Sequence, residues 1–262
     1  MENLILLIND DGVRSAGLLT AWNHLKELGE VVVIAPERHM SGAGKSISVG
    51  KELRVREQKI GDMLAYTISG TPADCILVGL FKLMRRKPDI VVSGINIGPN
   101  LGLDDFFSSG TVGAALEASI HGIKSVCASY CALSFEEPSI YLERTGKILS
   151  ELVGILLSKG FPHETDLFSL NFPIKFKGPI KLTRLAKSSY PDVFEEISPN
   201  RYAWISWDME LYQGEQGSDV SAIMEGAISL TPISLERLSS IPFDQRLADI
   251  TRELNKRAGF LV

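Results

Sequence analysis

The chain has 262 residues, 45% of them hydrophobic, and a formal net charge of −5 at pH 7. It is long enough to bury a sizeable core, and its acidic balance gives no electrostatic footprint for a nucleic-acid polymer. No apolar run is long enough to span a membrane, and the N-terminus lacks the features of a signal peptide, so we expect a cytoplasmic protein. Its three cysteines are an odd number in apolar contexts, which predicts buried, reduced thiols.

Strand and helix signals alternate over roughly the first half of the chain, which predicts βαβ units around a mostly parallel sheet. Strands are expected at Leu4–Ile8, Val31–Ala35, Asp89–Ser93, Ser125–Ser129 and Leu167–Phe172, with shorter strand-like pieces at Ser46–Val49, Leu53–Glu57 and Leu64–Ile68. Helices are expected at Ala16–Leu28, from Thr71 to about Arg86, at Thr111–Ile120 and at Tyr141–Ser158. The intervening segment from Gly94 to Ser109 is rich in glycine and asparagine, which indicates a loop.

The pattern changes beyond Pro173. Strand-like stretches at Ile180–Leu185 and Tyr202–Trp207 flank a polar, aromatic segment and suggest an extended hairpin. A strand at Ile228–Thr231 and a charged amphipathic helix at Phe243–Gly259 follow. We therefore expect a catalytic core over residues 1–175 and a C-terminal extension over 176–262, comprising the hairpin, the final core elements and the terminal helix.

The most informative motif is Asn9-Asp10-Asp11-Gly12-Val13, which follows directly on the apolar run Leu4–Ile8. Ligand sites in open α/β sheets gather at the carboxyl ends of such buried strands. Two adjacent carboxylates there repel each other and lose solvation, so a folded chain tolerates them best beside a cation. The motif thus suggests a metal-dependent active site, although a solvated turn explains these residue types as well.

Two further polar loops follow predicted strands and are expected to meet the first at one sheet edge. One contains Ser41-Gly42-Ala43-Gly44 and the other Ser93-Gly94-Ile95-Asn96. Ser41 and Asn96 add neutral oxygen ligands to the carboxylates of Asp10 and Asp11. Such an all-oxygen set favours Mg²⁺, Mn²⁺ or Ca²⁺ over zinc. Taken alone, the glycine loop is more typical of a flexible turn, and His39 nearby is expected to be solvated.

Ser109-Gly110-Thr111 is expected at a helix start, where unpaired backbone N–H groups and hydroxyls can bind phosphate oxygens. Ser109 can also act simply as the helix cap. A cation site beside an anion site indicates a phosphate ester as substrate.

Several motifs in order resemble the SurE family (survival protein E) of metal-dependent nucleoside monophosphate phosphatases. They are Asn9–Gly12, Ala35-Pro36 through Ser41 to Ser46, Ser69–Asp74, Ser93–Asn96 with Gly98–Gly102, Ser109–Val112, Gly217–Val220 and Gly226–Pro232. The resemblance covers nearly the whole chain. It implies a Rossmann-like α/β fold, helices on both faces of the sheet, and a C-terminal extension that reaches a partner subunit in a homodimer or homotetramer.

The resemblance also implies an activity and its residues. The chain would be a 5′-nucleotidase, with possible 3′-nucleotidase and polyphosphatase side activities, and would hold one Mg²⁺ or Mn²⁺ per subunit. Asp10, Asp11, Ser41 and Asn96 would be the metal ligands, and Asp10, Asp11 and Asn96 catalytic. The substrate or phosphate contacts would come from Asn9, Gly42, Asn100, Ser109, Gly110 and Thr111.

The chain departs from the usual family pattern at Ser198–Tyr202, which retains a single arginine, and at Ser108, often tyrosine or histidine. A non-catalytic nucleotide-binding module is the main alternative, yet it would not need the costly Asp10–Asp11 pair. A receiver domain is typically about half this length. A covalent aspartyl phosphatase usually has alternating rather than adjacent aspartates.

Overall fold

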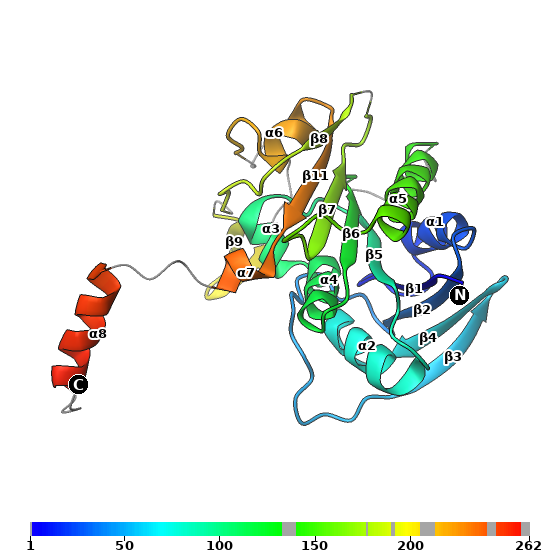
Figure 1. The fold of residues 1–262 in the computed structure, drawn as a ribbon, viewed down its shortest axis with the longest axis horizontal. Coiled ribbons are helices and arrows are strands. Elements are labelled where there is room, and N and C mark those ends of the chain that lie inside the picture. Colours follow the sequence, from blue (N-terminus) through cyan, green and yellow to red (C-terminus); the bar gives the residue numbers. More distant parts are fainter. Residues whose placement is uncertain are drawn as a thin grey trace.

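The computed structural model describes residues 2–132, 140–176, 178–189, 192–204, 213–239 and 245–257. A nine-stranded sheet in the order β3-β4-β2-β1-β5-β6-β7-β11-β8 forms its centre (Figure 1). Neighbours from β4 to β7 in this order are parallel, whereas β3 and β11 pair antiparallel with β4 and β7. The mostly parallel α/β fold predicted from the sequence is therefore confirmed.

The strands of this sheet are β1 (Leu4–Ile8), β2 (Glu30–Pro36), β3 (Val55–Ile60), β4 (Met63–Ile68), β5 (Ile90–Ile97), β6 (Ser125–Tyr130), β7 (Leu167–Phe172), β8 (Ile180–Leu182) and β11 (Ile228–Ile233). The helices are α1 (Ala16–Leu25), α2 (Pro72–Val78), α3 (Gly102–Ser108), α4 (Gly110–Ile120), α5 (Ile140–Lys159), α6 (Asp219–Met224), α7 (Leu235–Ser239) and α8 (Gln245–Arg257).

Helices cover both faces of the sheet, and this explains why the central strands are hydrophobic without alternation. Ile5 and Leu7 of β1 face the core formed with α1 and α5, whereas Leu6 and Ile8 face the core formed with α2 and α4. Figure 1 shows the α1–α5 pair and the α2–α4 pair on opposite sides of the strands. A strand buried on both faces reads as a continuous apolar run, as β1 does.

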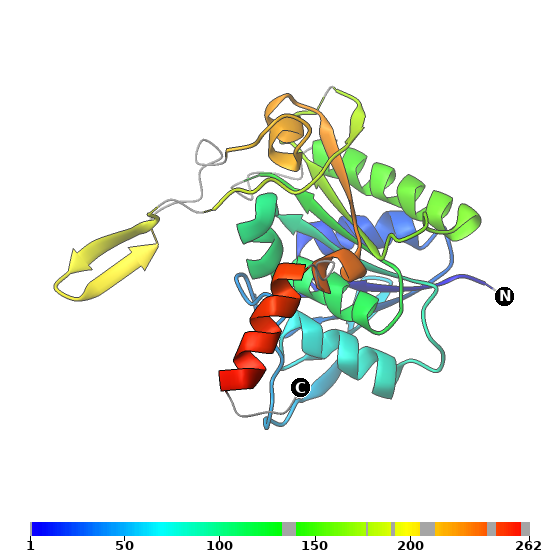
Figure 2. The same cartoon turned by 60° about the vertical axis from the view of Figure 1, so that its left-hand side comes forward.

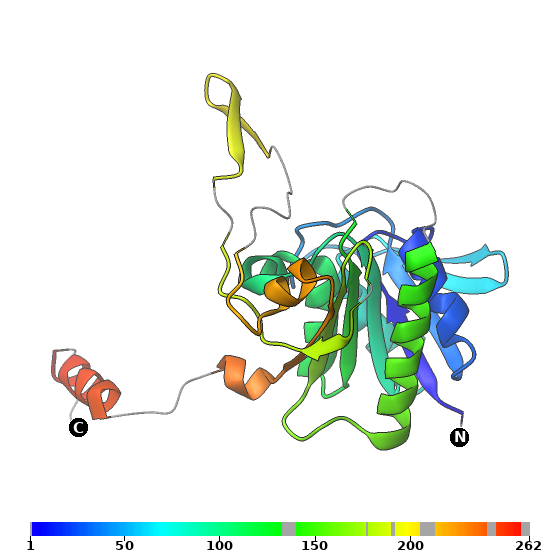
Figure 3. The ribbon, with the colours of Figure 1, turned by 90° about the horizontal axis from the view of Figure 1, so that it is seen from above.

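Two elements of the C-terminal part extend away from the sheet. A separate hairpin of β9 (Phe194–Ser198) and β10 (Arg201–Trp204) projects from one side, in yellow in Figure 2. The amphipathic helix α8 lies apart from the sheet in a different direction, as the view from above in Figure 3 shows. Among the described residues, no helix combines the length and the hydropathy that crossing a membrane requires.

Three sequence predictions about local structure were wrong. The arms of the hairpin are not the 180–185 and 202–207 stretches, because β8 pairs with β11 in the main sheet and β10 pairs with β9. The 94–109 segment is not all loop, since β5 runs to Ile97 and α3 spans Gly102–Ser108. Ser46–Val49 forms no strand. The expected elements at 202–207 and 243–259 also reach outside the described residues.

The helix expected from Thr71 to about Arg86 is shorter than predicted. Thr71 and Asp74 form a reciprocal capping box at its start, as expected. The α-helix ends at Val78 and continues as a single π-helical turn, Gly79–Leu83.

We predict that Gly17→Ala destabilises the fold by separating α1 from β5. A methyl group on Gly17 would lie 1.9 Å from the backbone oxygen of Ile95, so helix and strand must move apart. Overpacking of this kind costs about 1–3 kcal/mol, which should lower the melting temperature by about 5 °C.

Gly154→Ala in α5 is the matched control, because the nearest heavy atom to its added methyl group, Leu28 Cδ2, lies at an ordinary 3.6 Å. Alanine should stabilise that helix by up to about 1 kcal/mol. Equal melting temperatures for the two variants would contradict the tight α1–β5 contact.

Candidate active site

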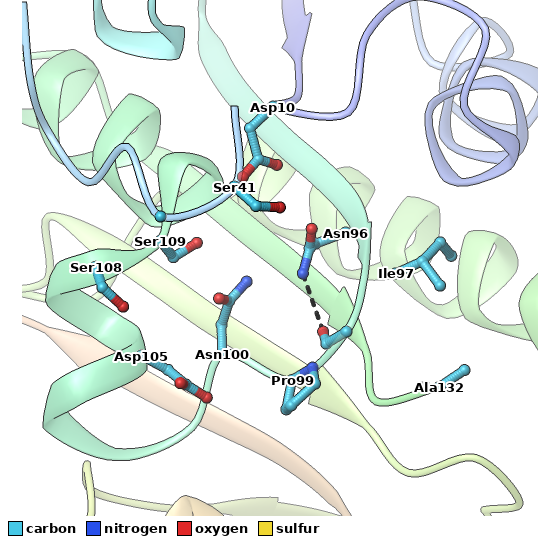
Figure 4. Close-up of a pocket in the computed structure, with 12 residues that line it drawn as sticks. Asp10, Ser41, Asn96, Ile97, Pro99, Asn100, Asp105, Ser108, Ser109 and Ala132 are labelled. Atoms are coloured by element: carbon cyan, nitrogen blue, oxygen red, sulfur yellow. Dashed lines mark hydrogen bonds between the residues drawn. The ribbon is translucent and has the colours of Figure 1, made fainter. Parts of the chain in front are cut away.

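A cavity of about 240 Å³ lies at the carboxyl end of β1 and β5 (Figure 4). Its walls come from the end of β1, the segment after β2, the turn after β5, and the α3–α4 junction. The lining residues are Asp10, Ser41, Gly42, Asn96, Ile97, Gly98, Pro99, Asn100, Asp105, Ser108, Ser109 and Ala132. The three loops predicted to meet at one sheet edge do meet.

Asp10 is buried and is held by the first turn of α4. The hydroxyl of Thr111 donates to Asp10 Oδ1 over 2.5 Å. Burial raises the pKa of Asp10, and the hydrogen bond from Thr111 opposes that rise. Gly110 permits this contact, because a Cβ there would lie 2.9 Å from both Cβ and Oδ2 of Asp10.

Asp11 is the second buried carboxylate, with a side chain only 5% exposed. Burial and repulsion from Asp10 raise its pKa to about 6. Its Oδ1 lies 2.9 Å from His39 Nε2, while its buried Oδ2 has no hydrogen-bond partner among the described residues. A buried carboxylate oxygen without a partner is costly and fits a site built for a cation.

Ser41 and Asn96 bring neutral oxygens to the same end of the cavity as Asp10. Asn96 Nδ2 donates to the backbone oxygen of Gly98 over 3.0 Å. This bond turns the amide oxygen of Asn96 toward Asp10 and Ser41 (Figure 4). Asp10, Ser41 and Asn96 therefore bring oxygen atoms to one end of the cavity, and such donors suit a hard divalent cation. Asp11 does not line this cavity and lines a neighbouring pocket with Gly12 and Arg14.

The described part of the chain contains no cluster of three or more His, Cys, Asp or Glu side chains able to hold a metal ion. The candidate ligands at the cavity differ from such a cluster, because Ser41 and Asn96 are not acidic. The three cysteines are free and buried, in agreement with the expectation of reduced thiols. Burial raises the pKa of Cys127 to about 12, so this thiol is a poor metal ligand.

Two residues assigned to the substrate have other contacts. The side chain of Asn9 bonds within the β1–α1 turn, to the backbone of Gly12 and to Ser15 Oγ. Thr111 is fully buried and bonds to Asp10. Neither residue lines the cavity, so their contacts hold the aspartate loop in place.

Asn100, Ser109 and Gly42, three of the residues that the resemblance assigns to the substrate, line the cavity. Two hydrogen bonds orient Asn100. Its Nδ2 donates to Ser129 Oγ over 2.7 Å, and its backbone N–H donates to Asn171 Oδ1. Ser109 Oγ accepts from the backbone N–H of Val112 and so caps α4 while facing the cavity. Gly110 lies at the cap but does not line the cavity.

Sequence reasoning missed several residues of this site. His39, expected to be solvated, is exposed at its edge but lies 2.9 Å from both Asp11 Oδ1 and Ser41 Oγ. Asp105 lines the cavity from α3, a helix that the sequence did not predict. Ser108, which the sequence analysis named only as a departure from the family pattern, lines it from the same helix. The one available signal for His39 was its position two residues before Ser41.

The model of the family described as Survival protein SurE matches residues 5–192. A 5′-nucleotidase SurE of Archaeoglobus fulgidus is 40% identical over 92% of this chain and 94% of its own length. The 5′-nucleotidase SurE of Methanosarcina acetivorans is 39% identical over 94% of this chain and 97% of its own.

The crystal structure of the SurE protein from Aquifex aeolicus superposes with a TM-score of 0.74 at 33% identity. The match covers 97% of this chain and 99% of that one. The fold, the order of the motifs and these relatives together lead to one conclusion: the chain belongs to the SurE family.

Proposed function

We propose that this protein is a divalent-metal-dependent phosphomonoesterase that hydrolyses nucleoside 5′-monophosphates to nucleoside and phosphate. The observation that carries the proposal is the adjacent pair Asp10 and Asp11. Buried Asp10 lines the cavity beside the oxygens of Ser41 and Asn96, and Asp11 has a buried oxygen with no hydrogen-bond partner among the described residues. The relatives named 5′-nucleotidase SurE support the same activity. A binding module would gain nothing from two buried carboxylates with raised pKa values.

Asp10, Asp11, Ser41 and Asn96 would hold one Mg²⁺ or Mn²⁺ ion. When bound, the cation supplies positive charge that offsets the negative charge of the phosphoryl oxygens and favours attack by water. Its affinity should fall in acid, because Asp11, with a pKa of about 6, must lose its proton to become a ligand.

The remaining groups of the cavity would bind the phosphate ester. The Ser109 hydroxyl donates to a phosphoryl oxygen, and the positive end of the α4 dipole lies behind it. Asn100, held by Ser129 and Asn171, contributes a fixed polar group at the floor. At about 240 Å³ the cavity is smaller than the roughly 300–1,000 Å³ of typical ligand pockets. It therefore suits the phosphate and the adjoining sugar.

The substrate class is tested with a panel of phosphate esters. Chelated protein, then protein with Mn²⁺ or Mg²⁺ added back, is incubated with 5′- and 3′-nucleoside monophosphates, glycerol phosphate and tripolyphosphate. We expect metal-restored phosphate release that is fastest from 5′-nucleotides. If the metal-loaded protein bound nucleotides but released no phosphate, the protein would be a non-catalytic nucleotide-binding module and not a phosphatase.

We also propose that the C-terminal extension assembles a homodimer or homotetramer. In α8, Leu247, Ile250 and Leu254 share one face, and the last two are 57% and 63% exposed. The β9–β10 hairpin likewise exposes Phe194, Ile197 and Tyr202. Apolar faces of this kind, away from the chain's own core, suit burial against a second copy.

This assembly predicts that a chain ending at residue 239 loses subunits in light scattering while it keeps its folded core. The double variant Ile250→Asp/Leu254→Asp should give the same smaller particle. A wild-type protein that is monomeric at micromolar concentration would contradict the proposal.

A further inference from the structure

The segment between β2 and β3, residues 37–54, carries Ser41 but contains no helix or strand. Sheet or helix hydrogen bonds therefore do not fix Ser41, and long irregular connections are usually either mobile or functional. Gly42 and Gly44 on either side of Ala43 have positive φ angles, and Gly42 has open space around it. The Ser41 hydroxyl lies 2.9 Å from His39 Nε2, but His39 belongs to the same segment. The position of the segment as a whole must therefore depend on contacts with other elements.

The backbone around Ser41 contacts the same elements that hold Asp10. The N–H of Met40 donates to the backbone oxygen of Asp10 over 2.8 Å. The N–H of Gly44 donates to the backbone oxygen of Ser108 over 2.8 Å, at the α3–α4 junction. Gly113 of α4 lets the segment approach, because a Cβ there would lie 2.2 Å from the oxygen of Gly44.

An ion pair joins this segment to α4. Lys45 Nζ contacts Glu117 Oε2; the Glu117 side chain is only 6% exposed, whereas the lysine side chain is 37% exposed. Glu117 Oε1 also lies 3.1 Å from Nε2 of His121, the C-cap residue of the same helix. A buried carboxylate requires a cationic partner, so removing the lysine leaves an unfavourable charge inside α4.

We propose that Lys45 and Glu117 are positioning residues of the metal site. The inference rests on the role of Ser41 as a metal ligand, proposed above. The first turn of α4 holds Asp10 through Thr111, and its third turn holds the Ser41 segment through Glu117. The ion pair therefore makes one helix the common support of two ligands that come from different loops.

The test measures Mn²⁺ affinity by calorimetry on metal-free, folded protein, so it needs no turnover. Lys45→Met and Glu117→Gln should each weaken Mn²⁺ binding by roughly 10-fold, within the 10–100-fold range of residues that support ligands. Lys45→Arg retains the charge and should bind Mn²⁺ nearly as the wild type does. Unfolding in urea verifies that each variant is folded.

A double-mutant cycle separates positioning from general stability. If Lys45 acts through Ser41, then Lys45→Met should have little further effect on Mn²⁺ affinity in a Ser41→Ala background. Lys124→Met is the matched control, because it breaks the Lys124–Asp166 ion pair at the amino ends of β6 and β7, whereas the site lies at the carboxyl ends of the strands. That variant should bind Mn²⁺ as the wild type does.

Three results would overturn the inference. If Lys45→Met and Glu117→Gln both bound Mn²⁺ with wild-type affinity, the ion pair would have no role in positioning the metal site. The proposed phosphatase activity would be unaffected by that result. Fully additive losses in the cycle would show that Lys45 acts independently of Ser41. A wild-type protein that binds no Mn²⁺ would remove the proposed metal site itself, and the inference with it.

Discussion

Asp10→Asn is expected to lower kcat/KM for a nucleoside 5′-monophosphate by about a thousand-fold at saturating Mn²⁺. The substitution keeps the size of a side chain that is 3% exposed but removes its charge from the metal set. A metal ion contributes several kcal/mol of charge stabilisation, and about 4 kcal/mol corresponds to three powers of ten in rate. The amide can still accept the hydrogen bond from Thr111, so the fold should survive.

The measurement is phosphate release with purified variants at matched metal concentrations. Asp62→Asn is the control, because it makes the same chemical change in the exposed turn between β3 and β4. The control should retain wild-type kcat/KM. An Asp10→Asn variant with more than a tenth of wild-type activity would exclude Asp10 as an essential ligand.

Asp11→Asn is expected to stabilise the metal-free protein at pH 8 while abolishing metal-dependent activity. The folded-state pKa of Asp11 is about 6 against an ordinary value of 3.8. A carboxyl whose pKa is raised on folding stabilises the fold below the unfolded value and loses that contribution as pH rises through the folded value. Two pKa units correspond to about 3 kcal/mol, shared here with the coupled Asp10.

Asparagine removes this pH-dependent cost. Metal-free Asp11→Asn should therefore gain about 2 kcal/mol at pH 8, or about 5 °C in melting temperature, and little at pH 4. Added Mn²⁺ should raise the melting temperature of the wild type but not of the variant, because only the wild type binds it. A variant less stable than the wild type at pH 8 would show that Asp11 is well compensated without metal.

The strands of the core could be predicted from the sequence, because their local hydrophobic pattern agrees with the way they pack in the fold. β1 and β7 have the predicted bounds, since each is a short apolar run buried on both faces. α3 was missed for a physical reason. Its cap position, Leu101, offers no side-chain hydrogen bond, and the preceding Gly98-Pro99-Asn100 has the composition of a turn.

The sequence could predict that the loops of the site lie close together. It could not predict the contacts between the side chains of those loops. Strand order places the end of β1 beside that of β5, which brings Asp10 and Asn96 together whatever the side chains do. The contact between His39 and Asp11 and the hydrogen bond from Thr111 to Asp10 depend on side-chain rotamers and on the placement of α4. No residue pattern encodes those. The hairpin was misassigned because β8 pairs with β11, almost fifty residues later.

The most direct test of the account is a crystal structure of the protein soaked in Mn²⁺, with data collected at the manganese absorption edge. We predict one strong anomalous peak per subunit within coordination distance of Asp10, Asp11, Ser41 and Asn96. A protein that releases phosphate from nucleotides yet shows no peak there, or binds Mn²⁺ only elsewhere, would contradict the proposed metal centre.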